Sequence, residues 1–260
     1  MTVNDYRKSC IRTVSVMNQL AIKIGANNPN HFSRIFDEVT GADTQSSGLW
    51  RKNFSGERSL SDKQLDRLLS IDSQVKKLHA EGPSKLWVAM WGDVSELISI
   101  LRGYTKNFSQ MPLYVITKQV SLSIRNSNED KKALKEMVWA ISIYRLTIDT
   151  QPSALVDGFH FTQASCAWAL VETCMRDKLV MRELDALGIS LKIKEELEAK
   201  ESDRRNNLTS DQWLQDAGAH GYYEEVSWEE AELMGAFLED ALSEEDAVDP
   251  FGIEATVFSY

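Results

Sequence analysis

The stretch LAIKIGANNPNHFSRIFDEVTG, residues 20–41, constrains the fold of this chain more than any other segment. Four of its first five residues are apolar, and Gly25 follows them at a position where a turn can require a positive φ. Asn28 can cap a second helix that has Pro29 at its first position, where a missing backbone N–H costs nothing. Aromatic and aliphatic side chains then recur at helical spacing. The stretch therefore predicts two short helices around a tight turn, the layout of a DNA-binding helix-turn-helix.

The same stretch resembles the second helix-turn-helix of AraC-type regulators. In that family an Ala stands four residues before a Gly, a Phe-Ser-Arg begins seven residues after that Gly, and a further Gly stands five residues after the next aromatic residue. The matching residues here are Ala21, Gly25, Phe32-Ser33-Arg34, Phe36 and Gly41. The resemblance implies that the predicted helix over 29–38 faces the major groove of DNA.

A second stretch, LWRKNFSGERSLS over residues 49–61, resembles the end of the recognition helix in Cro/repressor-like domains. In that family an aromatic residue, a Gly-Lys/Glu-Arg turn and a capped helix follow one another. Ser61-Asp-Lys-Gln64 has the pattern of a capping box, as this resemblance requires. The 35 residues from Ala21 to Gly56 exceed the repressor-like spacing, so the resemblance implies a divergent domain with an insertion. An ordinary helical hairpin that contacts no DNA is the alternative.

The chemistry of the side chains selects the residues that would contact double-stranded DNA. Arg favours guanine edges and Asn favours adenine edges, so polar residues of the helix over 29–38 are expected to read bases. Basic residues elsewhere are expected to hold phosphates, which position a protein without specifying a sequence. The predicted base-reading residues are Asn30, His31, Ser33 and Arg34. The predicted phosphate-binding residues are Lys23, Arg51, Lys52 and Arg58.

The net charge of −10 is unevenly distributed along the chain. Residues 1–90 carry a net charge of +4, residues 91–180 carry +1 and residues 181–260 carry −15. No Lys or Arg follows Arg205, whereas 14 acidic residues do. This asymmetry indicates different partners for the two ends, although a solvated acidic surface would give the same pattern. A charge of +4 is modest, so DNA affinity would need dimerisation or a focused basic face.

Helical periodicity runs through the rest of the chain, and no run of alternating strand residues stands out. We expect a mainly α protein with a helix-turn-helix-like domain over 1–80, a larger helical domain over 86–205 and an acidic helical extension over 206–260. Capping boxes that begin at Thr209 and Ser227 predict helices within the extension.

Three segments of the larger domain have distinctive patterns. Residues 129–149 have the spacing of a moderately amphipathic helix. From Phe161 to Met175 the apolar residues cover so much of the helix circumference that we expect this helix at the centre of its domain. The segment from Leu191 to Arg205 is highly charged and predicts a solvated helix or a hinge.

Catalytic and metal-binding patterns are weak. The four histidines are scattered, and none forms an H-x-x-x-H pair. Cys166 and Cys174 are eight residues apart with Leu170 between them, which favours core thiols over a shared metal. The chain has no glycine-rich phosphate loop and no G-x-S-x-G sequence. We therefore expect no enzyme activity, no cofactor and no metal.

Three cysteines without a C-x-x-C pair, a polar N-terminus and the lack of a long apolar run predict a cytoplasmic protein without a membrane segment. The leading hypothesis is a sequence-specific DNA-binding transcriptional regulator of a prokaryote or a mobile element. It would act as a homodimer or with a protein partner. The first alternative is a non-catalytic adaptor whose acidic C-terminal part binds a basic partner or mimics DNA. The second is an enzyme whose active site assembles from distant residues.

Overall fold

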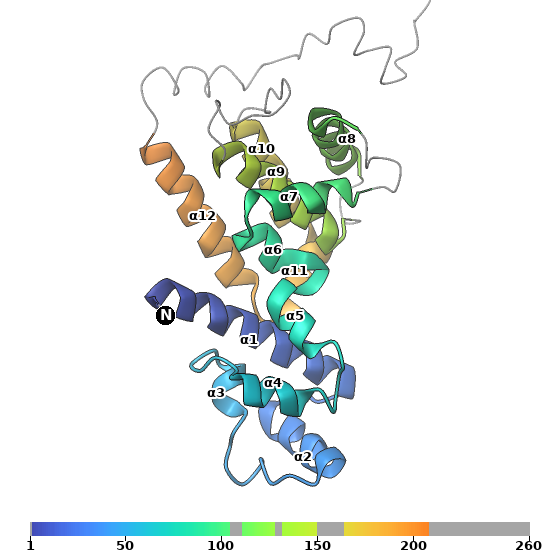
Figure 1. The fold of residues 1–260 in the computed structure, drawn as a ribbon, viewed down its shortest axis with the longest axis vertical. Helices are drawn as coiled ribbons and strands as arrows, with labels where there is room; N and C mark the ends of the chain where they lie inside the picture. The colour runs from blue at the N-terminus through green and yellow to red at the C-terminus, as the bar shows by residue number, and fades with distance from the viewer. Residues whose placement is uncertain (1, 105–110, 128–131, 150–163, 208–260) are drawn as a thin grey trace, which may run out of the picture. The chain divides into compact units, whose positions relative to one another are not determined.

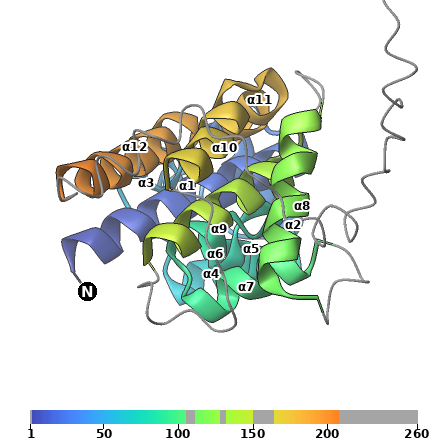
Figure 2. The same ribbon diagram turned by 90° about the horizontal axis from the view of Figure 1, so that it is seen from above.

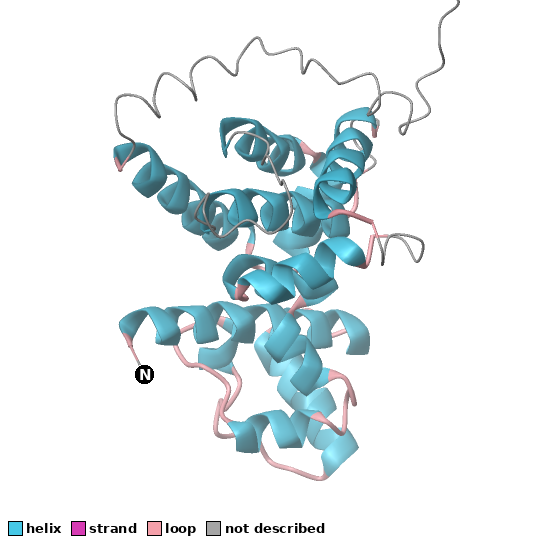
Figure 3. Ribbon diagram, turned by 45° about the horizontal axis from the view of Figure 1, so that its top comes forward, coloured by secondary structure: helices cyan, strands magenta, loops and turns pink. Residues whose placement is uncertain are grey.

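The structure is a computed structural model of the chain, and it describes residues 2–104, 111–127, 132–149 and 164–207. Throughout these residues the regular secondary structure is helical and no strand occurs (Figure 3), which confirms the predicted mainly α class. No helix in this part of the chain is long and apolar enough to span a bilayer. The acidic extension beyond residue 207, with its predicted caps at Thr209 and Ser227, lies outside the described residues.

The N-terminal helices are α1 (Val3–Ile24), α2 (Pro29–Thr40), α3 (Arg51–Phe54), α4 (Asp62–Leu68) and α5 (Val75–Glu81) (Figure 1). The predicted turn at Gly25 between two helices is confirmed, but the first of them is a long helix of 22 residues rather than a short one. Gly25 ends α1 with a φ of 70°, and the Asn28 side chain accepts a hydrogen bond from the first turn of α2. Ser61 caps α4 in the predicted capping box with Gln64. These signals depend only on residues a few positions apart, so the local sequence specifies them.

The larger helical part begins with a short 3₁₀-helix, η1, and continues to residue 206. Its elements are η1 (Pro83–Lys85), α6 (Leu86–Trp91), α7 (Val94–Arg102), α8 (Leu113–Asn126), α9 (Leu134–Asp149), α10 (Ala164–Arg176), α11 (Lys178–Ala186) and α12 (Ser190–Asn206). Helix α9 packs against α6, α7, α8, α10 and α11 (Figure 2).

Helix α9 is the centre of this part, whereas the sequence predicted α10. Nine side chains of α9 are buried and five of α10 are buried. Helix α9 also begins at Leu134 rather than at residue 129. Apolar coverage of a helix circumference shows that the helix can be buried, but which helix is surrounded depends on how the others fold around it.

The buried apolar side chains form two clusters that share α1. The N-terminal cluster consists of Val16, Met17, Leu20, Ala21, Phe32, Phe36, Trp50, Leu60, Leu65, Leu68 and Val75. The second cluster takes Ile11 and Val14 from α1 and otherwise begins at Leu86. The domain boundary near residues 80–86 stays a prediction, because the two clusters meet on α1.

Helix α12 matches the predicted solvated helix over 191–205, except that one side of it is buried. Its buried side chains are Ile193, Leu197 and Glu201, which follow one another at intervals of four residues. That spacing places them on one face of the helix, and the other charged residues occupy the remaining faces. The helix is therefore attached along its length to the larger helical part.

His79 on α5 makes the stability of the N-terminal helices depend on pH. Burial, followed by the nearby Arg12 guanidinium, lowers its pKa from 6.5 to about 4 against a weak opposing effect of Asp62. The unfolded chain binds a proton below pH 6.5, whereas the folded chain does not until about pH 4, so stability falls as pH drops through this interval.

We expect wild-type protein to lose on the order of 2 kcal/mol of stability between pH 7 and pH 4.5 through His79 alone. Urea denaturation of wild type and His79→Gln at both pH values measures this loss. The difference in unfolding free energy between the two proteins should change with pH in favour of the variant at low pH. A difference that stays constant would show that His79 is not the titrating group.

Candidate nucleic-acid interface

Asp37 at the end of α2 holds the start of the chain segment over 44–58. Its carboxylate accepts hydrogen bonds from the Thr44 N–H at 2.9 Å, the Thr44 hydroxyl at 2.7 Å and the Gln45 N–H at 2.8 Å. Burial alone would raise the pKa of the Asp37 carboxyl, but the hydrogen bonds from Thr44 and Gln45 outweigh it and lower this pKa. A charged carboxylate therefore fixes the backbone where the segment begins.

Trp50 fixes the same segment six residues later. Its indole N–H donates to the Thr44 hydroxyl at 3.1 Å. The ring is fully buried and lies edge-on to Phe36 and Phe32, with centroid distances of 5.2 and 6.1 Å. Phe54 of α3 adds a further edge contact to Phe32 at 5.3 Å. The aromatic cluster thus anchors the segment on α2.

Four exposed residues lie between these two anchors: Gln45, Ser46, Ser47 and Gly48. Asp37 and Trp50 hold the backbone on either side of them, and the Ser47 hydroxyl donates to the Thr44 carbonyl at 3.0 Å. Gln45 and Ser46 present polar side chains of the kind that can hydrogen-bond to base edges, and Gly48 leaves its backbone uncovered. Sequence reasoning missed them, although they immediately precede the Leu-Trp-Arg of the repressor-like match.

The residues over 51–58, which we call the α3 turn, form a closed and supported turn. Asn53 is fully buried and donates to the Arg58 carbonyl at 3.0 Å, and it accepts from the Gln64 amide at 3.2 Å. The Arg58 N–H donates to the Lys52 carbonyl at 3.1 Å. Tyr6 of α1 donates its hydroxyl to the Glu57 carbonyl at 2.9 Å. The turn is therefore held by its own residues and by α1.

The three predicted phosphate-binding residues of the α3 turn are exposed together. Arg51, Lys52 and Arg58 make no ion pair with any other residue of the described part. The one carboxylate in the turn belongs to Glu57, and it accepts a hydrogen bond from the Ser55 hydroxyl at 2.9 Å. Unpaired cations on a rigid turn are available to an anion from solution.

Lys23, the fourth predicted phosphate-binding residue, lies elsewhere. Its ammonium pairs with Asp72 at 2.7 Å. Lys23 follows Tyr6 by 17 residues along α1, which corresponds to about 25 Å along the helix axis. The α3 turn contacts α1 at Tyr6 and near Val14, so the ion-paired Lys23 lies at least nine residues further along α1, beyond the turn.

The base-reading residues predicted on α2 divide into two groups. Asn30 and Arg34 are exposed, and Arg34 pairs with Glu38 at 3.7 Å. The prediction for Ser33 was wrong, because Ser33 is buried and its hydroxyl donates to the Pro29 carbonyl at 3.0 Å.

His31 belongs to the helix cap. Its N–H donates to the Asn28 side chain at 2.8 Å, and its Nδ1 lies 3.0 Å from the Asn27 side-chain oxygen. Of the four predicted base-reading residues, only Asn30 and the ion-paired Arg34 are thus exposed and outside the cap, which makes α2 a poorer reading surface than the sequence predicted. Residues 29–58 hold four basic and four acidic side chains, so positive charge is concentrated at the α3 turn rather than spread as a strip.

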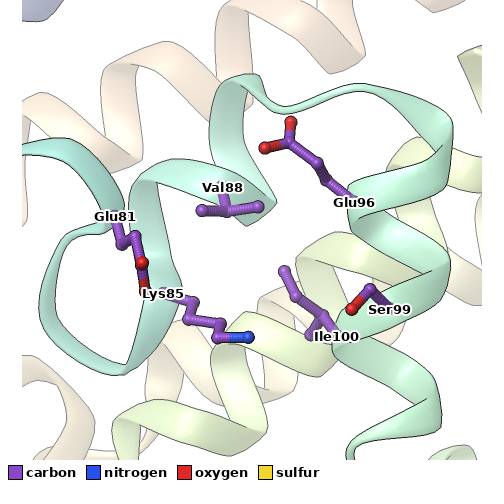
Figure 4. Close-up of a pocket in the computed structure, with 6 residues that line it drawn as sticks. All are labelled: Glu81, Lys85, Val88, Glu96, Ser99 and Ile100. Atoms are coloured by element: carbon purple, nitrogen blue, oxygen red, sulfur yellow. The ribbon is translucent and has the colours of Figure 1, made fainter. Parts of the chain in front are cut away.

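A pocket of about 190 Å³ lies apart from this segment, near η1, α6 and α7 (Figure 4). It is lined by Glu81, Lys85, Val88, Glu96, Ser99 and Ile100. Glu96 already accepts the Asp93 N–H at 2.9 Å in the capping box of α7. No group of three side chains within the described ranges could hold a metal ion.

One family model matches the chain, over residues 196–251. Its description is conjugal transfer, TraD, beta/gamma-type. The match begins on α12 and spans 56 of the 260 residues, most of them outside the described part. No curated protein and no solved structure matches the chain.

Proposed function

We propose that this protein binds double-stranded DNA through residues 44–58 and acts in connection with conjugal DNA transfer. The observation that carries the proposal is the exposed polar run over 45–48, fixed at both ends and followed by three unpaired cations. The polar run would meet base edges, and the cations would hold phosphates. A more specific version of this proposal is that the protein recognises a particular DNA sequence and regulates transcription.

The match over 196–251 supports a role linked to DNA, because the matched family is described by conjugal transfer, a process that moves DNA between cells. The small net charge of residues 1–90 limits the number of phosphate contacts that one copy can make. We therefore propose that a homodimer or a partner protein supplies the remaining affinity.

The second candidate function is that of a non-catalytic adaptor, and the charge of the matched segment favours it. Residues 196–251 hold 17 acidic and 3 basic side chains. Such a segment repels phosphate and is suited to a basic protein surface. A protein that acts only as an adaptor would not bind duplex DNA even at low salt, so DNA binding separates the two candidates.

The test is fluorescence anisotropy of the full chain with a labelled DNA duplex over a series of salt concentrations. Wild-type affinity should fall steeply with salt. The triple variant Arg51→Gln, Lys52→Gln, Arg58→Gln should reduce the slope of log K against log salt by about 0.9 for each phosphate that the protein no longer neutralises.

A matched control removes three exposed arginines from α7, α8 and α11, with the changes Arg102→Gln, Arg125→Gln and Arg182→Gln. The net charge changes by the same amount, so equal reductions of affinity in both triple variants would show a general charge effect instead of a site. Failure of wild type to bind the duplex at low salt would favour the adaptor.

A further inference from the structure

The α3 turn is in contact with α12, a helix far along the chain. A Cβ atom added at Gly56 would lie 2.9 Å from Lys192 Nζ and 3.0 Å from a methyl group of Val14. The ammonium of Lys192 therefore lies directly beside the backbone of the α3 turn. Gly56 has a φ of 75° and no side chain, which permits this close approach.

Contacts with α1 fix the start of α12 in this position (Figure 1). The Asn18 side chain donates to the Leu187 carbonyl at 3.2 Å, immediately before α12. Arg7 pairs with Glu196 at 2.9 Å and with Glu195 at 3.6 Å. Because α1 also supports the α3 turn through Tyr6, the turn and the first turns of α12 rest on the same helix.

Lys192 differs from the other lysines of α12 in its surroundings. Lys194 pairs with Glu198 at 3.7 Å, and Lys200 pairs with Asp149 at 2.9 Å. Lys192 is half-buried and has no ion pair within the described part of the chain. Its ammonium adjoins a turn that carries three cations and one carboxylate, and the nearest carboxylates of α12, Glu195 and Glu196, pair with Arg7 instead. An anion bound at the turn would give Lys192 a charged partner.

We propose that Lys192 completes the phosphate-binding surface of the α3 turn and contacts the backbone of duplex DNA next to Arg58. This inference rests on the proposed function. It adds a contact that neither helix-turn-helix resemblance contains, since Lys192 comes from the last helix of the described chain. Helix α12 then carries both a DNA contact and the start of the segment that matches the TraD family.

The test compares Lys192→Gln with Lys194→Gln in the full chain, using the same labelled duplex and salt series. Both variants remove one positive charge from α12. Lys192→Gln should lower the slope of log K against log salt by about 0.9 and weaken binding several-fold at low salt, whereas Lys194→Gln should leave the slope unchanged. Lys192→Arg keeps the charge and should bind like wild type. Thermal melting confirms that each variant is folded.

The outcomes separate this inference from the proposed function. Wild-type binding that depends on Arg51, Lys52 and Arg58 but not on Lys192 would overturn the inference and leave the proposed function intact. Equal weakening in the Lys192 and Lys194 variants would also overturn it, because the effect would then follow net charge. If the wild-type protein binds no duplex DNA, the proposed function is wrong, and the inference about Lys192 is wrong with it.

Discussion

Trp50→Ala should lower the free energy of unfolding by about 3–5 kcal/mol, as expected for removal of a fully buried aromatic side chain. The Trp50 ring is completely buried between Phe32 and Phe36 and is part of the N-terminal apolar cluster. Its removal leaves a cavity that the rigid helices around it cannot fill. Urea denaturation followed by circular dichroism measures the change.

Trp50→Phe is the matched control, because it keeps an aromatic ring and removes the N–H that donates to Thr44. We expect it to cost about 1 kcal/mol for the missing hydrogen bond, plus a smaller packing penalty. In this variant the free energy of DNA binding should change by more than the free energy of unfolding. The reason is that Thr44 and the exposed residues after it lose one of their two anchors. If Trp50→Ala were no less stable than Trp50→Phe, the aromatic cluster would not hold the segment.

The features of the fold that the sequence predicted are those that depend on near neighbours. Gly25, Asn28 and Ser61 act within one helical turn, and their chemistry alone determines the turn and the caps. The central position of α9 was not predictable in this way. It results from the packing of several helices from distant parts of the sequence, which hydrophobic spacing within one helix does not specify.

The error at Ser33 has a simple geometric cause. Successive residues of a helix are rotated by about 100°, so Ser33 lies about 60° from Phe36 around the helix axis, on the buried side. Asn30, Arg34 and Glu38 follow one another at four-residue intervals on the opposite side and are exposed. The positions of Phe32 and Phe36 in the sequence already define the buried side of the helix. That side includes Ser33, so the sequence alone argued against Ser33 as a base-reading residue.

The remaining parts of the candidate site needed the structure for different reasons. The basic residues of the α3 turn could be proposed from the sequence, because a positive charge suits phosphate whatever the fold. The exposure of residues 45–48 depends on Asp37 and Trp50, which anchor the chain from both sides. Lys192 could not be found, because only the packing of α12 on α1 brings it to the turn.

Glu201→Ala should destabilise the attachment of α12 by about 2–4 kcal/mol, because it removes a buried, ion-paired carboxylate and the acceptor of the buried Tyr144 hydroxyl. The Glu201 carboxylate is buried and accepts hydrogen bonds from the Tyr144 hydroxyl at 2.8 Å, from Arg204 at 2.8 Å and from Arg205 at 2.6 Å. The bond from Tyr144 joins α12 to the central helix α9.

The expected effect of Glu201→Ala depends on pH in a defined direction. Burial raises the pKa of the Glu201 carboxyl, but hydrogen bonds from Arg204, Arg205 and Tyr144 outweigh it and hold this pKa below its ordinary value of 4.5. A carboxyl with a lowered pKa in the folded state contributes stability above pH 4.5, and this contribution is lost as pH falls through the folded-state pKa. The difference in unfolding free energy between wild type and Glu201→Ala should therefore be largest at pH 7 and should decrease as the pH falls below 4.5.

Glu198→Ala supplies the comparison, because Glu198 lies on the same helix, is exposed and pairs with Lys194 at 3.7 Å. An exposed pair of this kind is worth about 0–1 kcal/mol. Hydrogen exchange in α12 should consequently accelerate in Glu201→Ala and change little in Glu198→Ala. Equal exchange rates in the two variants would show that the C-terminal end of α12 is held by the apolar contacts of Ile193 and Leu197 instead of by the carboxylate. In that case Lys192, at the other end of the helix, would keep its place beside the α3 turn without any contribution from Glu201.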